Sequence, residues 1–272
     1  MTVKIGKSPV SKARMLETLL ATVPVEGALD YYGCLLKSMV KNRSIINLGR
    51  PNVYLERPVV VKQGKRLFYL DGYTGFVSSV FIRAYEPNTY DAIIKSSGEL
   101  FVDVGAYTGI YSINAAVSFN NIIALEPNPH TADILRKNIQ MNKTSNVEVV
   151  QKAASDKTGP ITLYEGIFSS TYTTAENFVL AKPGGTKMEI SGITLDSLLS
   201  PYDRIDLVKI DVEGSELSVL EGAKETLPRI QKLIVEVDKG SSRDVMRLLR
   251  GFRPSPLEEG DLSDNIMFIR VS

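Results

Sequence analysis

The chain has 272 residues, of which 43% are hydrophobic and 23% charged, with one cysteine, one histidine and no tryptophan. This length permits one large domain, or one domain with a substantial extension, and the composition is that of a folded globular protein. Because Cys34 is the only cysteine, an internal disulfide is excluded, and one histidine excludes zinc sites built from several Cys or His ligands. A reducing, cytoplasmic location fits this composition best.

The net charge of +1 hides an uneven distribution. Residues 1–66 carry 12 Lys or Arg against 4 acids, a balance of +8, which leaves the remainder at −7. This basic front favours an anionic partner, whether a nucleic acid, an anionic membrane surface or a phosphorylated small molecule, and a solvated, solubilising face is the alternative. No stretch approaches the roughly 18 apolar residues of a membrane span, and we interpret residues 1–23 as a helix rather than a signal peptide.

Residues 1–98 differ in pattern from the rest of the chain. Residues 11–47 have a helical pattern in which Cys34 is expected in the core, and VVVKQGKRLFYL at 59–70 predicts a β-hairpin with its turn near Gln63-Gly64. We therefore expect an N-terminal extension over residues 1–90, helical at first and then a hairpin. Its role is open. Either it helps to wall an acceptor pocket, where basic residues on the hairpin (Lys62, Lys65 and Arg66) favour an anionic acceptor, or it is a homodimerisation arm.

From residue 99 onward, runs rich in Val and Ile alternate with helical patterns, which is typical of β-α-β units around a parallel sheet. Strands are expected at 100–104, 121–126, 147–153, 205–211 and 232–237. Helices are expected at 108–119, with Ile110, Ile113, Ala116 and Val117 as its apolar positions, from Asn128 onward, at 214–227 up to Pro228, and at 242–252. A last strand at 266–271 arrives after only a loop and is expected to be antiparallel. Residues 159–195 interrupt the alternation and predict an inserted hairpin or flap.

The string FVDVGAYTGIYS at 101–112 predicts a ligand-binding turn. Asp103 lies near the end of a buried strand, Gly105 permits a tight turn with close ligand approach, and Gly109 lets the backbone pass a bound group. Glu126 follows at the tip of the second strand, 21 residues after Gly105, where a carboxylate can accept both hydroxyls of a ribose. The turn and the second-strand acid together predict a nucleoside site.

Missing motifs narrow the choice of nucleoside. The turn lacks the G-x-G-x-x-G pattern and the chain lacks a phosphate loop, so phosphate binding is disfavoured. Asp103 could, directly or through water, favour an ammonium group. S-adenosylmethionine combines such a group, at its amino acid end, with an adenosine.

Seven motifs in this order resemble those of the FkbM family of S-adenosylmethionine-dependent methyltransferases. They are YEP at 85–87, FVDVGAYTGIYS at 101–112, ALEPNP at 124–129, AASDKTG at 153–159, ITLDSLL at 193–199, KIDVEGSELSVLEGA at 209–223 and IVEV at 234–237. The resemblance covers residues 66–270 and leaves residues 1–65 outside. It implies an α/β, Rossmann-like class I methyltransferase domain, at 91–272, whose seven-stranded, mostly parallel sheet has an antiparallel last strand.

The resemblance also implies positions around the cofactor. The methionine part would be surrounded by Asp103, Gly105, Ala106, Tyr107 and Gly109, and the ribose would be bound by Glu126. The adenine would be bordered by Pro127 and Asn128 and by the stretch Ala154, Ser155 and Asp156. Ala153 stands where related enzymes often have an aspartate, so Ser155, Asp156 or the backbone alone would make that contact.

Asp211 and Glu213 follow a central strand at the carboxyl edge of the sheet, where open α/β sheets place reactive groups. Asp211 is the candidate for orienting the acceptor or acting as a base, and it also borders the cofactor, with Glu213 beside it. Alternatively, Glu213 and Glu216 cap the first turn of the next helix, which is the favoured interpretation for Glu216.

Two further sets of residues are candidates for a functional role. Asp211, Glu236 and Asp238 could bind a divalent cation, but no spacing demands one and no metal is assigned. His130 lies in the first turn of a helix, so a surface or capping role is expected rather than catalysis.

The predicted function is methylation of a hydroxyl on a sugar-like or other small molecule. One alternative is methylation of RNA, because of the basic front and the likeness of residues 126–142 to a helix of some tRNA methyltransferases. The lack of an Asn-Pro-Pro-Tyr type motif speaks against RNA. The other alternative is a non-catalytic adenosine-binding scaffold.

Overall fold

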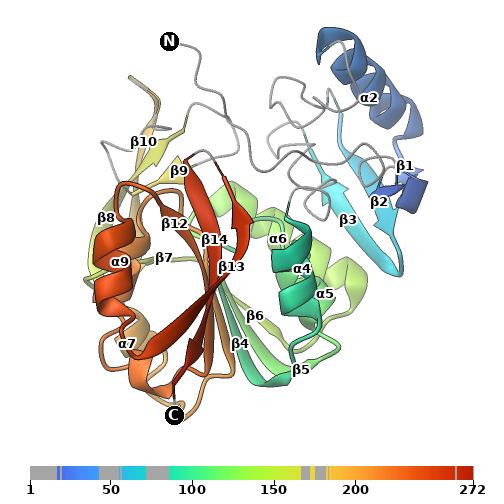
Figure 1. The fold of residues 1–272 in the computed structure, drawn as a ribbon. Helices are drawn as coiled ribbons and strands as arrows, with labels where there is room; N and C mark the ends of the chain where they lie inside the picture. Colours follow the sequence, from blue (N-terminus) through green and yellow to red (C-terminus); the bar gives the residue numbers. More distant parts are fainter. Residues whose placement is uncertain are drawn as a thin grey trace.

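The computed structural model describes residues 17–18, 20–42, 55, 57–71, 86–166, 172–174, 182, 184–260 and 262–271 (Figure 1). The first part of the helix expected at 11–47, and much of the expected flap tip, lie outside these residues. No helix in the described ranges is long and apolar enough to cross a membrane.

A seven-stranded sheet forms the centre of the larger domain. Its strand order is β13-β14-β12-β11-β4-β5-β6. The bounds are Gly98–Val104 (β4), Phe119–Leu125 (β5), Val147–Val150 (β6), Leu207–Ile210 (β11), Lys232–Asp238 (β12), Phe252–Glu259 (β13) and Ser263–Arg270 (β14). The strands from β12 to β6 are parallel, and β14 is antiparallel to both of its neighbours. The predicted class I sheet with an antiparallel last strand is therefore confirmed.

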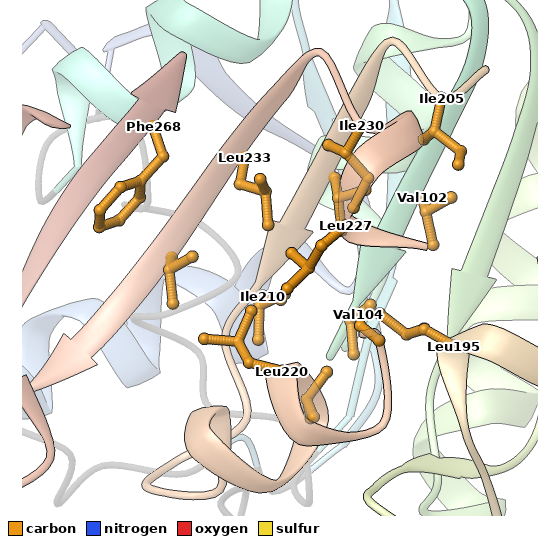
Figure 2. Close-up of a cluster of buried hydrophobic side chains, with 14 of the residues drawn as sticks. Val102, Val104, Leu195, Ile205, Ile210, Leu220, Leu227, Ile230, Leu233 and Phe268 are labelled. Atoms are coloured by element: carbon orange, nitrogen blue, oxygen red, sulfur yellow. The ribbon is translucent and has the colours of Figure 1, made fainter. Parts of the chain in front are cut away.

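Helices cover both faces of this sheet, which explains why the central strands are continuous apolar runs. The first face carries α4 (Pro87–Ile94), α5 (Ile110–Ala115) and α6 (Pro129–Asn142). The second carries α7 (Leu195–Leu198), α8 (Glu216–Glu221), the 3₁₀ turn η2 (Leu227–Arg229) and α9 (Ser242–Leu248). Figure 2 shows the core of the second face, where Val104 and Ile210 of the sheet lie near Leu220 of α8.

Several local predictions in this domain were wrong. Residues 252–259 form the strand β13 rather than a loop. Pro254 lacks a backbone N–H and is tolerated because β13 is an edge strand, which pairs with β14 on one side only. The helix predicted at 108–119 ends at Ala115, so Val117 is 76% exposed. The helix predicted up to Pro228 ends at Glu221, because the chain turns there before η2.

The segment predicted as a flap forms a small sheet of its own. Its order is β7-β10-β8-β9, with bounds Ala153–Ala154 (β7), Gly159–Glu165 (β8), Tyr172–Thr173 (β9) and Lys187–Ile193 (β10). The antiparallel pairing of β8 with β10 confirms the predicted hairpin. The strand expected at 147–153 is divided, because its end, β7, joins this small sheet instead of the central one.

The N-terminal extension contains a three-stranded sheet covered by one helix. Its elements are β1 (Thr22–Glu26), α2 (Ala28–Asn42), β2 (Val59–Gln63) and β3 (Arg66–Leu70). The hairpin β2–β3 confirms the prediction, with its turn at Gly64. The strand β1 corrects the expected continuous helix, because Thr22 and its neighbours pair with β2. Cys34 of α2 is buried, as expected.

Two asparagines of α6 attach this extension to the larger domain. The side-chain oxygen of Asn142 accepts the Leu67 amide at 2.9 Å, and its nitrogen donates to the Leu67 carbonyl at 2.6 Å. Asn138 accepts the Tyr69 amide at 2.7 Å in the same way. The asparagines thus satisfy the edge of β3 that faces α6, as a further strand would.

Candidate cofactor and acceptor site

The glycine turn after β4 is held between the ends of two neighbouring strands. The amides of Gly105 and Ala106 both donate to the Leu125 carbonyl of β5, at 3.0 and 2.9 Å. On the other side, a Cβ added to Gly105 would lie 1.9 Å from the carbonyl oxygen of Asp211. Gly105 also has φ +82°, which favours glycine. The turn therefore depends on glycine for both its conformation and its contact with Asp211.

The same turn contains a second left-handed glycine and a left-handed tyrosine. Gly109 has φ +89°, and a Cβ there would lie 2.4 Å from Leu135 of α6. Tyr107 has φ 52° and is partly exposed. Non-glycine residues in this region cluster at functional sites because the surroundings must hold them there.

Glu126 joins the glycine turn to the start of α6. Its carboxylate accepts the amide of Tyr107 at 3.0 Å and the amide of Asn128 at 2.9 Å. Burial raises the pKa of Glu126 to about 7, although the two amides oppose this effect. The predicted ribose acid is thus fixed in place by backbone donors on both of its oxygens.

Asn128 caps α6, as the sequence predicts. Its side-chain oxygen accepts the amides of His130 and Thr131 at 2.9 and 3.2 Å, and Pro129 opens the helix. The side-chain oxygen of Asn128 is thus engaged in the helix cap, and the preceding Pro127 is half-buried. The ring of His130 is half-exposed and lies 2.8 Å from Asp71, in agreement with the expected surface role.

A buried ionic cluster connects strand β4 with the end of strand β11. The ammonium of Lys209 lies 3.1 Å from Asp211 and 3.9 Å from Asp103. Asp103 is fully buried, accepts the Ser112 hydroxyl at 2.6 Å, and has a second oxygen without a hydrogen-bond partner among the described residues. Burial raises the pKa of Asp103, while Lys209 and Ser112 lower it.

Lys209 is stabilised as a cation despite its position inside the sheet. Burial alone would lower its pKa, but Asp211 and Asp103 raise it above the ordinary value. The ammonium also lies 4.9 Å from the ring centre of Tyr111, whose hydroxyl donates to Glu86 at 2.7 Å. One buried cation therefore balances carboxylates on both sides of the site.

The loop after β11 has a conformation that few sequences adopt. Glu213 has φ 54° and Gly214 has φ +91°. Glu216 accepts the Gly214 amide at 2.9 Å, and its other oxygen is buried without a hydrogen-bond partner among the described residues. Burial raises the pKa of Glu216 to about 7. Glu216 lies in the first helical turn, as expected, whereas Glu213 precedes the helix and does not cap it.

The small sheet contacts this loop directly. The hydroxyl of Thr174 donates to Ser215 at 2.7 Å, and the neighbouring Thr173 is buried. After β7, Asp156 accepts the hydroxyls of Ser155 and Ser218 at 2.9 and 3.0 Å, and these hydrogen bonds lower its pKa. The stretch that includes Ala154 is therefore tied to α8 as well as to β10.

The metal alternative gains no support from the described side chains. Glu236 accepts the Ser263 hydroxyl at 2.5 Å, and Asp238 accepts the Gly240 amide at 2.7 Å. Over the parts of the chain that the structure describes, no group of three or more His, Cys, Asp or Glu residues is arranged to hold a metal ion.

Sequence reasoning missed Lys209 and Ser215. The sequence contained a signal for Lys209, because a lysine inside the apolar run LVKI needs a carboxylate partner when the strand is buried. For Ser215 no signal existed, since its partner Thr174 belongs to an inserted segment whose position the sequence did not indicate.

Comparisons with known proteins identify the family of this chain. The FkbM methyltransferase domain matches residues 103–254. The methyltransferase sdnD of Sordaria araneosa is 28% identical, over 54% of this chain and 68% of that protein. The hexuronic acid methyltransferase AglP of Haloferax volcanii is 31% identical, over 54% of this chain and 59% of that protein. The 31-O-demethyl-FK506 methyltransferase FkbM of Streptomyces tacrolimicus is 28% identical, over 60% and 75%.

Proposed function

Because the chain belongs to the FkbM family of S-adenosylmethionine-dependent methyltransferases, we propose that it methylates a hydroxyl oxygen of a sugar-like small molecule. The observation that carries the proposal is the packing of the glycine turn on Asp211, since it brings the donor side and the acceptor side together. The names of two relatives support this acceptor class, because one refers to a hexuronic acid and the other to an O-demethyl compound.

The charges around the turn suit a cationic donor. Lys209 lies between Asp103 and Asp211, and these two carboxylates interact electrostatically with Glu126 and Glu216 respectively. The donor's ammonium and sulfonium would offset this excess of carboxylates. We propose that Gly105, Ala106, Tyr107 and Gly109 surround the methionine part, that Glu126 binds the ribose, and that Pro127, Asn128 and the 154–156 stretch border the adenine. Asp103 would act from beneath the turn, because its side chain is fully buried.

When bound, S-adenosylmethionine supplies a methyl group that its sulfonium activates. The protein must then orient the acceptor hydroxyl and receive its proton. We assign this task to Asp211, with Glu213 as the second candidate on the same loop. Lys209 lies 3.1 Å from Asp211 and balances its charge, so Asp211 is held at the strand end where it can orient the hydroxyl and take its proton as the new bond forms.

The small sheet and the extension are proposed to border the acceptor. The hydrogen bond from Thr174, which follows β9, to Ser215 joins the small sheet to the loop that carries Glu213, and this contact supports the small sheet as one wall.

We also propose that the methyltransferase domain begins at Glu86 rather than at residue 91, because α4 runs across that boundary and packs on α5 and β13.

The proposal is tested by methyl transfer from labelled S-adenosylmethionine to glucuronic acid, galacturonic acid, their neutral sugars and bulk tRNA. We expect a labelled sugar whose label survives mild alkali, because a methyl ether is stable there and a methyl ester is not. An alkali-labile label would reassign the acceptor atom to a carboxylate. Label in tRNA alone would replace the small-molecule proposal with the RNA alternative.

A further inference from the structure

Glu86, the central residue of the YEP motif, is a buried carboxylate beside the ionic cluster around Lys209. It is 3% exposed and immediately precedes α4. Among the described residues, its side chain makes no capping hydrogen bond to that helix, and its carboxylate accepts the hydroxyl of Tyr111 at 2.7 Å. Burying a carboxylate is costly unless its contacts compensate, so the contact with Tyr111 indicates a role beyond the helix end.

The N-terminus of α4 is capped from another strand. Glu258 of β13 accepts the amides of Asn88 and Thr89 at 2.6 and 3.0 Å, and its second oxygen accepts the Thr89 hydroxyl. Glu258 is buried as well, so two carboxylates lie at one end of this helix. The cap hydrogen bonds belong to Glu258, and this separates the role of Glu86 from that of a helix cap.

Tyr111 connects Glu86 with Lys209. It is the second residue of α5, which packs against α4 (Figure 1), and it is 6% exposed. Its hydroxyl is held by Glu86, and the centre of its ring lies 4.9 Å from the Lys209 ammonium, within the range of a cation–π contact. Hydrogen bonds to a carboxylate polarise the group that donates them. The hydrogen bond therefore orients the ring and also increases its attraction for the cation.

Lys209 in turn holds Asp211. The two charged groups lie 3.1 Å apart, and the side chain of Lys209 is 4% exposed whereas that of Asp211 is 25% exposed. Burial lowers the pKa of this lysine, and Asp211, Asp103 and then Glu86 raise it, so the four groups form one electrostatic unit. Asp103 lies 3.9 Å from the ammonium on the other side. If the ring of Tyr111 turns away, the ammonium can move toward Asp103, and Asp211 then loses its fixed partner.

Three motifs of the sequence meet in this series of contacts. YEP contributes Glu86, FVDVGAYTGIYS contributes Tyr111, and KIDVEG contributes Lys209 and Asp211. We propose that Glu86 is a positioning residue for methyl transfer, which acts through Tyr111 and Lys209 to fix the direction of Asp211 toward the acceptor hydroxyl. This inference rests on the proposed function, because it takes Asp211 as the group that receives the proton of the acceptor.

The first test measures turnover of the accepted sugar together with S-adenosylhomocysteine affinity. Tyr111→Phe keeps the ring and removes the hydroxyl, so kcat should fall about tenfold while KM for the sugar and donor-site affinity stay within about twofold. Glu86→Leu should cause the same loss, and combining the two changes should add nothing. Glu86→Gln keeps an acceptor for the hydroxyl and should recover most of kcat. Equal losses in the leucine and glutamine variants would overturn the inference.

The dependence on Asp211 is tested in the same assay. In an Asp211→Asn background, Tyr111→Phe should lower kcat no further, whereas a second tenfold loss there would overturn the inference. The matched structural control is Glu258→Ala, which removes the cap at the same end of α4. It should lower the free energy of unfolding and leave kcat within about twofold. A loss as large as that of Tyr111→Phe would mean that the position of α4 alone matters.

A second measurement does not depend on turnover. The ring of Tyr111 shifts the NMR signals of the Hε protons of Lys209, so a protein with isotope-labelled lysine reports this contact without donor or acceptor. Lys209→Met identifies the signal. We expect it to move in Tyr111→Phe and Glu86→Leu and to stay in place in Glu258→Ala. Unchanged signals in the first two variants would overturn the inference, whereas moved signals in a protein that methylates none of the sugars would reject the proposed function instead.

Discussion

The proposed donor side and the proposed acceptor side of the site are built in different ways. The donor turn at 105–109 is fixed by backbone hydrogen bonds to β5 and by glycines that leave no room for a side chain. The acceptor loop at 211–216 is fixed by side chains, with Lys209 on Asp211 and Thr174 on Ser215. The donor side thus requires particular backbone conformations, and the acceptor side requires particular charges and hydroxyls.

This difference suits the two tasks of binding one common donor and binding different acceptors. Every enzyme of the family uses the same donor, which a fixed backbone can hold. Acceptors differ among the relatives, as their names indicate, and side chains can change without rebuilding the sheet. Mutations should therefore affect the two sides differently, and the following predictions run from the largest expected effect to the smallest.

Gly105→Val should have the largest effect. The new Cβ would overlap the Asp211 carbonyl, and a β-branched residue cannot easily adopt the left-handed conformation. We expect a loss of about 4 kcal/mol or more in the free energy of unfolding, measured with urea. Gly64→Val is the matched control, because Gly64 is also left-handed but has open space around it. Equal losses in both variants would show that strain alone acts, without the contact to Asp211.

Lys209→Met should come next, because it leaves Asp103 buried without a cation. Removing one partner of a buried ion pair costs about 3–5 kcal/mol, and the same urea measurement would detect it. The control is the double variant Asp103→Asn with Lys209→Met, which removes the fully buried carboxylate together with the cation, leaves the partly exposed Asp211, and should recover most of the stability. If the single variant were as stable as the double, Lys209 would not balance Asp103.

The features that the sequence could predict also differ between the proposed donor side and the proposed acceptor side. The central strands were predictable because their Val and Ile runs are buried on both faces, and the donor turn was predictable because Gly105 and Glu126 lie close together along the chain. The strand β13 was missed because its prolines oppose strand formation in any position except an edge.

The acceptor side was predictable only as a list of residues. Asp211 and Glu213 could be placed at a strand end, but two neighbours on this side, Lys209 and Ser215, have partners in distant segments. Neither the pairing of Lys209 with Asp103 nor the contact of Thr174 with Ser215 has a periodic pattern. Such contacts follow from the packing of the whole domain, which a single sequence does not display.

Asp211→Asn should separate chemistry from donor binding. The variant keeps the size of the side chain and removes its charge, so turnover with the accepted sugar should fall about 100-fold while S-adenosylhomocysteine affinity stays within about threefold. Glu213→Gln serves as the comparison and should lower turnover less than tenfold. The reverse order would make Glu213 the residue that receives the proton.

Glu126→Ala should act on the donor alone. Two hydroxyl hydrogen bonds to a charged acceptor disappear, so we expect S-adenosylmethionine to bind about 2 kcal/mol more weakly in calorimetry. Because Glu126 also holds the Tyr107 amide, Glu126→Gln provides the control for turn geometry. It should bind the donor better than the alanine variant, and identical affinities for the wild type and both variants would mean that the ribose lies elsewhere.

Glu216→Gln should have the smallest effect, and pH reveals it. The pKa of Glu216 is about 7 in the folded protein and near 4.5 in the unfolded chain, so the folded state binds more protons between these values. Wild-type stability should therefore fall as pH rises from 4.5 through 7, because the buried carboxyl must ionise. Glutamine keeps an oxygen for the Gly214 amide and has no proton that titrates in this range.

Urea unfolding at pH 5 and pH 8 should show the variant gaining about 1–2 kcal/mol in the free energy of unfolding relative to the wild type at the higher pH. An equal difference at both pH values would show that Glu216 is already ionised throughout, and that its uncharged neighbours, not its own protonation, stabilise the loop beside Asp211.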